Sequence, residues 1–291
     1  METTIAAEAE AVARAAIGRV EETVGGVSLT LANKMGATLR PGWHAGALGP
    51  GDVLPTLWHW AAFPPDTPME GIGPDGHPAL GAFLPDLGLG RRMWAGGRLR
   101  FLKALHVAER LTKRSEITSV EWKQAGSGPM AIVSLDHVIS GEDGPAIEES
   151  QSIVYLRIPD TFRPPKAIPA PEGTAFDEEV PIDSVRLFRY SAATFNGHKI
   201  HYDRAYATEV EHYPGLIVHG PLQATLLIER AVRHRGGAAP RTLSHRGVHP
   251  CFEHEPMRLV GVDDGPAMTL CTATPPSIGG HQCMQVKAEW A

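Results

Sequence analysis

The chain has 291 residues, of which 43% are hydrophobic and 21% are charged, and its formal net charge is −6. These values are typical of a folded protein with one large or two ordinary domains. Residues 1–170 and residues 171–291 each carry a net charge of −3. Because neither part is basic, we expect neither nucleic acid nor an anionic membrane as a partner.

The first half of the chain predicts a helix followed by strands. We expect the helix over residues 4–23, ended by Gly25 and Gly26. Its acidic, alanine-rich sequence lacks the pattern of a signal peptide. Residues 38–92 are rich in glycine and proline and are expected to be irregular, with a short apolar island at residues 54–63. Partial alternation then predicts four strands, at about residues 97–107, 110–122, 129–139 and 147–158.

The second half is expected to follow a stiff linker. Residues 159–171 contain five prolines, which interrupt regular structure. Alternating apolar residues then predict a strand over residues 180–189. A helix is expected within residues 214–232, with Gly220 as its N-cap and Pro221 in its first turn. Four more strands follow, at residues 242–249, 257–262, 268–273 and 282–290.

Helical material precedes about four strands in each half, which indicates an α+β fold with an antiparallel sheet around a helix, formed twice. We therefore predict one domain over residues 1–158, a linker over residues 159–171 and a second domain over residues 172–291. Nine of the 14 histidines lie after residue 171, so proton chemistry is expected in the second domain. No apolar run approaches the ~20 residues that are needed to span a bilayer.

The cysteines favour a reducing compartment. They are odd in number and form no CxxC pair, so we do not expect a disulfide scaffold. We therefore expect a cytoplasmic location. A zinc site would need tighter ligand spacing than the chain offers, so we expect no metal and interpret the cysteines as small core residues. The residues weighed for it are Cys251, Cys271, Cys283, His249, His254 and His281.

Groups able to move protons are concentrated in residues 188–203, which read FRYSAATFNGHKIHYD. His201 offers an imidazole that can take a proton from water and deliver it again. Asn196 offers either a carbonyl that holds the water or a turn-forming side chain. Asp203 is either a second carboxylate that orients the histidine or a helix cap.

A predicted helix start follows at His219, Gly220 and Pro221. The first N–H groups of a helix lack partners within it and carry the positive end of the helix dipole. Such donors stabilise negative charge on an oxygen, and glycine lets a ligand approach the backbone closely. Pro221 has no N–H, so Gly220 is the expected donor, or else an ordinary glycine cap, with His219 ordering the loop.

The stretch from Tyr190 to Asp203 resembles the hydratase motif of the MaoC-like, hot-dog-fold (R)-specific enoyl-CoA hydratases, Tyr-Ser-x-x-(Thr/Ser)-Gly-Asp-x-Asn-Pro-Leu-His-x-Asp. His201 stands at the motif's catalytic histidine, whereas Asn196 replaces its catalytic aspartate. The variant TFNGHKIHYD is similar to a double-hot-dog branch that includes the mesaconyl-C4-CoA hydratases and the mitochondrial 3-hydroxyacyl-thioester dehydratases. Residues 54–60 (LPTLWHW) and 91–97 (RRMWAGG) resemble that branch as well.

This resemblance implies a double hot-dog fold and a hydro-lyase that adds water reversibly to an α,β-unsaturated acyl-CoA thioester. Its preferred form is conversion of mesaconyl-C4-CoA to citramalyl-CoA, without a metal or other cofactor. The expected catalytic residues are His201, Asn196, Gly220 and Asp203. The expected substrate-binding residues are Tyr190, His198, His219, Arg91 and Arg92.

Residues 1–158 contain no comparable Asn/Asp-x-x-x-x-His segment, so this half is expected to shape the acyl pocket without catalysing. Pairing of two hot dogs within one chain leaves further homo-oligomerisation open. The alternatives are a 3-hydroxyacyl-thioester dehydratase acting on CoA or acyl carrier protein, a non-catalytic acyl-CoA-binding protein, and a thioesterase. A GxGxxG pattern at residues 71–76 lies among prolines without a flanking strand or helix, so we expect it to be a plain loop.

Overall fold

The computed structural model describes residues 2–42, 47–125 and 128–290. The strands in these ranges form one ten-stranded sheet in the order β1-β3-β4-β5-β2-β7-β10-β9-β8-β6, and neighbouring strands are antiparallel. In chain order the strands are β1 (Val20–Gly25), β2 (Arg91–Phe101), β3 (Leu111–Ala125), β4 (Gly128–Gly141), β5 (Gly144–Leu156), β6 (Phe176–Val180), β7 (Thr242–Gly247), β8 (Met257–Asp264), β9 (Ala267–Ala273) and β10 (Gln282–Glu289).

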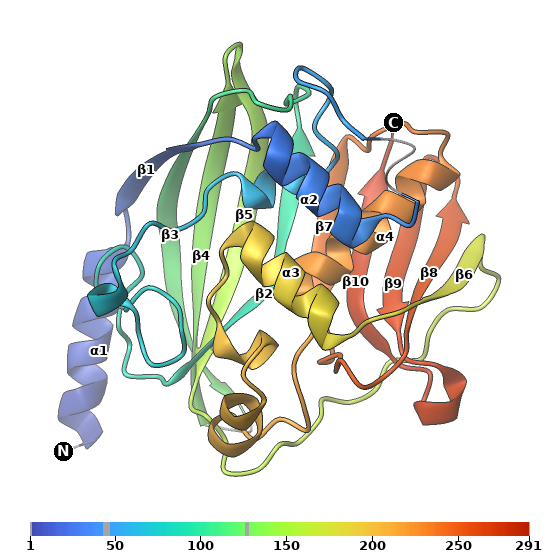
Figure 1. The fold of residues 1–291 in the computed structure, drawn as a ribbon. Helices are drawn as coiled ribbons and strands as arrows, with labels where there is room; N and C mark the ends of the chain where they lie inside the picture. The colour runs from blue at the N-terminus through green and yellow to red at the C-terminus, as the bar shows by residue number, and fades with distance from the viewer. Residues whose placement is uncertain (1, 43–46, 126–127, 291) are drawn as a thin grey trace.

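In the described ranges, four α-helices accompany the sheet: α1 (Glu2–Ala16), α2 (Leu29–Leu39), α3 (Ser184–Thr194) and α4 (Gly220–His234). Figure 1 shows α2 and α3 side by side in front of the sheet, and α4 packs against β8, β9 and β10. The Ser28 and Asp183 side chains cap α2 and α3 by accepting the backbone N–H of Leu31 and Arg186. None of the helices in the described part of the chain is long and apolar enough to cross a membrane.

The two halves of the chain meet at one seam in the sheet. Strands β1 to β5 precede the proline-rich residues 159–171, and β6 to β10 follow them. The seam is the pairing of β2 with β7, which runs from Gly96 opposite Arg246 to Arg100 opposite Thr242. The predicted α+β class is confirmed. The predicted domain boundaries remain a prediction, because the sheet is continuous across the seam.

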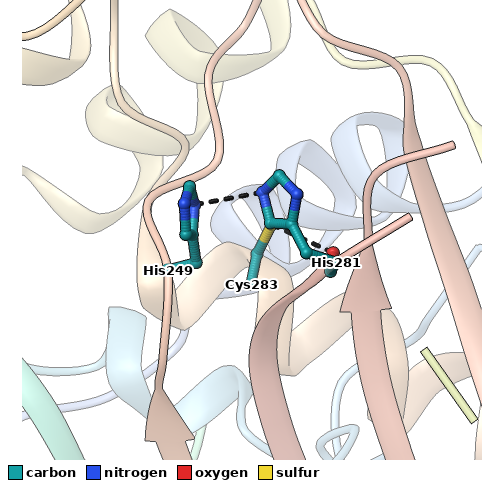
Figure 2. Close-up of side chains that lie close together, drawn as sticks. All are labelled: His249, His281 and Cys283. Atoms are coloured by element: carbon teal, nitrogen blue, oxygen red, sulfur yellow. Dashed lines mark hydrogen bonds between the residues drawn. The ribbon is translucent and has the colours of Figure 1, made fainter. Parts of the chain in front are cut away.

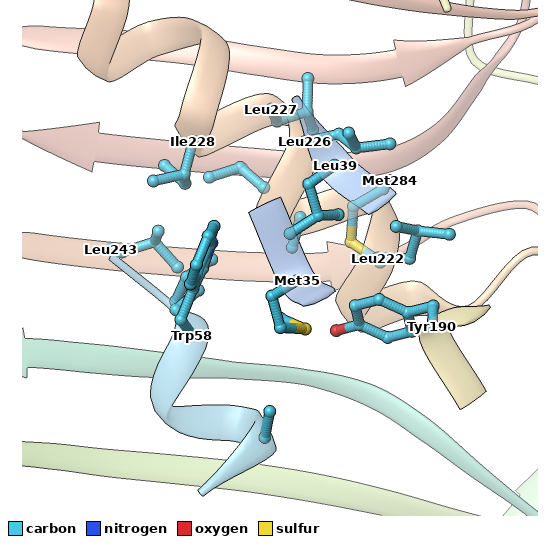
Figure 3. Close-up of a cluster of buried hydrophobic side chains, with 14 of the residues drawn as sticks. Met35, Leu39, Trp58, Tyr190, Leu222, Leu226, Leu227, Ile228, Leu243 and Met284 are labelled. Atoms are coloured by element: carbon cyan, nitrogen blue, oxygen red, sulfur yellow. The ribbon is translucent and has the colours of Figure 1, made fainter. Parts of the chain in front are cut away.

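The largest hydrophobic core also spans both halves. Figure 3 shows Met35 and Trp58 from the first half packed near Leu222 and Leu227 of α4. Each of these four side chains is at most 1% exposed. The start of α4 is therefore held by apolar contacts that neither half supplies alone.

Two predicted elements of the chain are wrong. The predicted helix over residues 4–23 ends at Ala16, because Gly18 has a positive φ of 83° and the chain then enters β1. The predicted strand over residues 180–189 is instead the end of β6 followed by α3, whose start is fixed by the Asp183 cap.

The remaining predictions differ from the structure mainly at element ends. The eight other predicted strands are present, with β2 starting at Arg91 instead of residue 97. Helix α2 was not predicted. The N-cap of α4 is His219, so Gly220 is the first residue inside the helix.

Candidate active site

The loop after α3 directs two histidine side chains toward the interior of the protein. Helix α3 ends at Phe195, which adopts a left-handed conformation with φ of 52°. The Asn196 Oδ1 atom then accepts the His198 N–H at 2.9 Å, closing a turn of the type that asparagine favours. A short 3₁₀ turn, Lys199–His201, follows. His198 and His201 are each only 7% exposed as a result.

The His201 ring is oriented so that one nitrogen stays available. Its Nδ1 lies 2.8 Å from the Ile217 carbonyl oxygen, which can only accept, so Nδ1 carries the proton. Burial lowers the pKa of His201 to about 4, although the hydrogen bond to Ile217 opposes the shift. At neutral pH the ring is therefore uncharged and presents Nε2 as a proton acceptor.

His219 connects this ring to the start of α4. The rings of His201 and His219 are stacked, with centroids 3.6 Å apart and planes inclined by 19°. His219 is fully buried, and its Nε2 lies 2.8 Å from the Ser191 hydroxyl. The Tyr190 ring meets it edge-on at 5.1 Å. Because His219 is the N-cap of α4, the stack places His201 beside the first turn of that helix.

Gly220 supplies the free backbone donor at this helix start. Its N–H has no acceptor among the residues that the structure describes, as expected for the first amide of a helix. A Cβ atom at this position would lie 2.8 Å from Trp94 Cε3, so glycine is required for this packing. His201 and Gly220 thus flank the same residue, His219, from the loop side and from the helix side.

Residues 75–77 of the first half also reach the site, which the sequence did not predict. The His77 ring lies 4.2 Å from the His198 ring, and His77 Nδ1 lies 3.0 Å from Asp75 Oδ2. The Lys199 N–H donates to the Asp75 carbonyl at 2.9 Å. Burial lowers the pKa of His77. Burial alone would raise the pKa of Asp75, but the hydrogen bond with His77 and the charge of Arg92 hold it well below its usual value.

Gly76 makes this contact between the two halves sterically feasible. It has a φ of 90°, and a Cβ atom there would lie 1.9 Å from the Gly197 carbonyl oxygen. The GxGxxG stretch is therefore a loop, as expected, but one that packs on the histidine loop. The sequence feature that could have indicated this contact is the Asp-Gly-His order of residues 75–77, in which two polar side chains flank a glycine.

Arg91 and Arg92 are engaged by internal acceptors. Arg91 is 6% exposed and donates to the Glu211 side chain at 2.5 Å and to the Glu211 carbonyl at 2.6 Å. The Arg92 guanidinium donates to Asp75 Oδ2 at 3.3 Å and to the Pro78 carbonyl at 2.8 Å. Arg92 thus belongs to the chain of contacts that ends at His77. The predicted binding of substrate by these arginines stays a prediction.

Asp203 occupies a capping position. Its Oδ1 accepts the Tyr206 N–H at 3.0 Å, which starts the helical segment that leads into the π-helical turn Tyr206–Val210. Asn196 has one carbonyl lone pair committed to the His198 N–H. The structure therefore gives both residues a role in shaping the loop, and their predicted catalytic roles stay predictions.

A second histidine pair lies outside this site. His249, His281 and Cys283 offer ligand atoms within 4.8 Å of one another, although their sequence spacing argued against a metal site. Figure 2 shows the two rings facing each other, with His281 Nε2 3.1 Å from His249 Nδ1. His249 Nδ1 also lies 2.8 Å from the Pro250 carbonyl, so its proton already has acceptors. Cys251, Cys271 and Cys283 are free and buried.

The curved antiparallel sheet around α4, with a buried histidine loop at the helix start, defines a class: the double hot-dog proteins of the MaoC-like type. A MaoC-like dehydratase from Phytophthora capsici superposes with a TM-score of 0.70 at 12% identity, over 94% of this chain and 96% of that one. A Mycobacterium tuberculosis protein with a double hot-dog fold superposes with a TM-score of 0.58 at 13% identity, over 94% and 95% of the two chains. Identities this low establish the fold alone.

Sequence comparison gives the family. Residues 57–253 match the model of hydroxyacyl-thioester dehydratase type 2. The mesaconyl-C(4)-CoA hydratase of Chloroflexus aurantiacus is 40% identical over 261 residues, which cover 87% of this chain and 90% of that protein. The chain belongs to the hydroxyacyl-thioester dehydratase type 2 family and is a hydro-lyase.

Proposed function

We propose that the protein adds water reversibly to the carbon–carbon double bond of an α,β-unsaturated acyl-CoA thioester. The preferred reaction is conversion of mesaconyl-C4-CoA to citramalyl-CoA, the substrate class named by the relative that is 40% identical. One observation carries the proposal: an uncharged imidazole, His201, lies beside the free N–H at the start of α4. We place the reaction in the cytoplasm, where free thiols such as Cys251 persist.

The proposed reaction needs one base and one set of donors. His201 Nε2 takes a proton from water while the water oxygen bonds to the β carbon. The electrons of the double bond move toward the thioester, and negative charge develops on its oxygen. The Gly220 N–H and the dipole of α4 stabilise that charge. The imidazolium then returns the proton to the α carbon, so the cycle needs no cofactor.

The other residues of the site are proposed to position these groups. Asn196 holds the loop through His198 and keeps a second lone pair for the attacking water. Asp203 caps the segment that follows. His219 stacks on the ring of His201, and Tyr190 packs edge-on against His219. Asp75 and His77 support His198, and they supply from the first half a carboxylate with an oxygen within 4.8 Å of a His198 ring nitrogen.

The second candidate is dehydration of a 3-hydroxyacyl thioester, which the family's description favours. It uses the same proton cycle in the opposite direction, with a longer acyl chain on CoA or acyl carrier protein. An assay with both short and long acyl esters distinguishes it, since preference for long monocarboxylic chains would favour this candidate.

The direct test follows the ultraviolet absorbance of the enoyl thioester with the wild type and with His201→Ala. We expect the variant to lose about 100-fold or more in kcat, the usual contribution of a general base. The control is His106→Ala, because the His106 side chain is 44% exposed and lies beside Glu109 in the connection between β2 and β3. Equal rates for wild type and His201→Ala would refute the mechanism, and release of free thiol would identify a thioesterase instead.

A further inference from the structure

A cavity of about 220 Å³ lies between the start of α4 and the inner face of the first-half sheet. Pro221 forms one wall, and it follows Gly220 directly in the chain. Trp94, which packs against Gly220, forms another part of the wall. An acyl group whose thioester oxygen is bound at Gly220 therefore has this cavity within reach of its far end.

The opposite wall is polar where an acyl-chain pocket is expected to be apolar. The inward positions of β3, β4 and β5 carry Lys113, His137, Glu149 and Gln151 there. These residues interrupt an otherwise apolar sheet face. Hydrophobic residues continue on both sides of them, with Leu111 and Ile139 in one core cluster and Ile117 and Leu135 in another.

Both carboxylate oxygens of Glu149 have hydrogen-bonding partners within the protein. One of its oxygens accepts from Trp60 Nε1 at 2.9 Å and from Gln151 Nε2 at 2.6 Å, and the other lies 3.2 Å from His59 Nε2. Burial alone would raise its pKa, but the hydrogen bond with His59 and the charges of the neighbouring histidines lower it to about 2. The Glu149 carboxylate thus holds the side chains that surround it in place, and its lone pairs accept hydrogen bonds from these protein donors.

Lys113 is the basic residue in this wall of the cavity. It forms no salt bridge with the residues that the structure describes, and its Nζ lies 5.0 Å above the Phe63 ring. Burial lowers its pKa, which the charge of Glu149 opposes. Nearby, His245 stacks on Trp94 at 4.1 Å, and both of its ring nitrogens are buried without a partner among the described residues. Among the described residues, the cavity surroundings therefore hold a cation that forms no salt bridge and an imidazole without a hydrogen-bond partner, which together favour an anionic ligand group.

We propose that this cavity binds the free carboxylate of a short dicarboxylic acyl group and that Lys113 is the specificity-determining cation. The inference rests on the proposed function, because it places the thioester at Gly220. Size supports it as well, since pockets for drug-sized ligands measure about 300–1,000 Å³ and this one measures 220 Å³. A long hydrocarbon chain would instead have to bury Lys113 and Glu149 against methylene groups.

The first experiment measures binding and needs no turnover. Succinyl-CoA and butyryl-CoA have saturated four-carbon acyl chains and differ in the distal carboxylate, so isothermal titration calorimetry compares their affinities for the full chain. We expect the wild type to bind succinyl-CoA about 10- to 100-fold more tightly, the range for a charged hydrogen bond. Equal affinities in the wild type would overturn the inference, whatever the variants do.

The second experiment removes the cation. Lys113→Met removes the charge and keeps most of the length of the side chain, and it should abolish the preference for succinyl-CoA while leaving butyryl-CoA binding within about twofold of the wild type. The matched control is Lys123→Met on the same strand, because Lys123 is exposed and pairs with Glu121 at the surface. A preserved preference in Lys113→Met would overturn the assignment of Lys113, and retained butyryl-CoA binding shows that the variant is folded.

Kinetics separate this inference from the proposed function. With mesaconyl-C4-CoA, Lys113→Met should raise KM about tenfold or more with a smaller change in kcat, whereas crotonyl-CoA kinetics should stay unchanged. If the wild type hydrates crotonyl-CoA but shows no preference for dicarboxylic esters, the inference fails and the hydratase stands. If the wild type hydrates neither ester but prefers succinyl-CoA in binding, the hydratase fails and the carboxylate site stands.

Discussion

The histidine ring at position 201 shows how burial sets the chemistry of a single residue. The ring is largely buried, stacked on His219 and hydrogen-bonded to Ile217, and this burial disfavours the charged form and lowers the pKa of His201 to about 4. The unshifted value is 6.5. Between these two values the ring in the folded protein stays uncharged, whereas an exposed histidine would become protonated.

This shift predicts the acid limb of the pH profile. We expect kcat/KM to stay nearly constant from pH 8 to about pH 5.5 and to fall only as the pH approaches 4, because kcat/KM reports the pKa of the base in the free enzyme. A break between pH 6 and 7 would contradict a buried His201 base. Initial rates over this range, in a buffer of constant ionic strength, give the measurement.

The stability of the folded protein must be followed in the same experiment, because protonation of a buried histidine also changes the free energy of unfolding. A lowered histidine pKa means that the folded state binds fewer protons than the unfolded state below pH 6.5. The stability that the folded protein has with His201 uncharged is therefore fully present above pH 6.5. It is lost progressively as the pH falls toward 4. His137 and His245, whose pKa values burial also lowers to about 4, act in the same direction. Circular dichroism at each pH separates unfolding from loss of the base.

At the scale of elements, the site depends on the packing of one loop on another. The stretch around Gly76 lies against Gly197, and it brings Asp75 and His77 to the histidine loop after α3. The backbones of Gly76 and Gly197 approach so closely that neither position has room for a Cβ atom. The loop that is proposed to carry the proton chemistry is therefore positioned by contacts from the other half of the chain.

Gly76→Ala tests this packing. The new Cβ atom would lie 1.9 Å from the Gly197 carbonyl oxygen, so the loop must move away and His77 with it. We expect kcat to fall by about 100-fold, as a displacement of ~1 Å at an active site can cause. The matched control is Gly81→Ala, which has a similar positive φ of 108° but no atom within 4 Å of the added Cβ.

Both substitutions impose the backbone strain of an alanine at positive φ, which costs roughly 1–2 kcal/mol. The melting temperature should therefore fall in both variants, and only Gly76→Ala should lose most of its activity. Equal activity in the two variants would show that residues 75–77 do not support the reaction.

At the scale of the whole molecule, the two halves share one sheet and one core. The seam joins β2 to β7, and Met35 and Trp58 of the first half pack in the cluster that holds α4 (Figure 3). Separation would expose the unpaired edge of β7 and apolar surface that is now buried. Exposed edges and large apolar patches promote association between chains.

We therefore expect a fragment of residues 172–291 to be insoluble or to self-associate, as measured by size-exclusion chromatography with light scattering. Co-expression with residues 1–171 should restore a soluble one-to-one complex, because the β2–β7 pairing and the common core can re-form. A soluble, monomeric and active fragment would contradict the proposed dependence of the second half on the first.

Features that depend on neighbours along the chain could be predicted from the amino-acid sequence. Partial alternation of apolar residues predicted strands such as β4 and β5, and the motif from Tyr190 to Asp203 indicated the family, because periodicity and motif spacing are local properties. It failed for α3, where the same apolar residues fit both a strand and a helix and the Asp183 cap decided the outcome.

Contacts between residues that are distant in the chain became visible in the folded structure. It placed Asp75 and His77 against His198, engaged Arg91 and Arg92 with internal acceptors, and left Lys113 without a salt bridge among the described residues beside the cavity at Pro221. These outcomes depend on the pairing of β2 with β7 and on close backbone contacts across more than a hundred residues. No local pattern encodes them, because the free energy that selects them comes from burial and steric fit between segments that are separate in the chain.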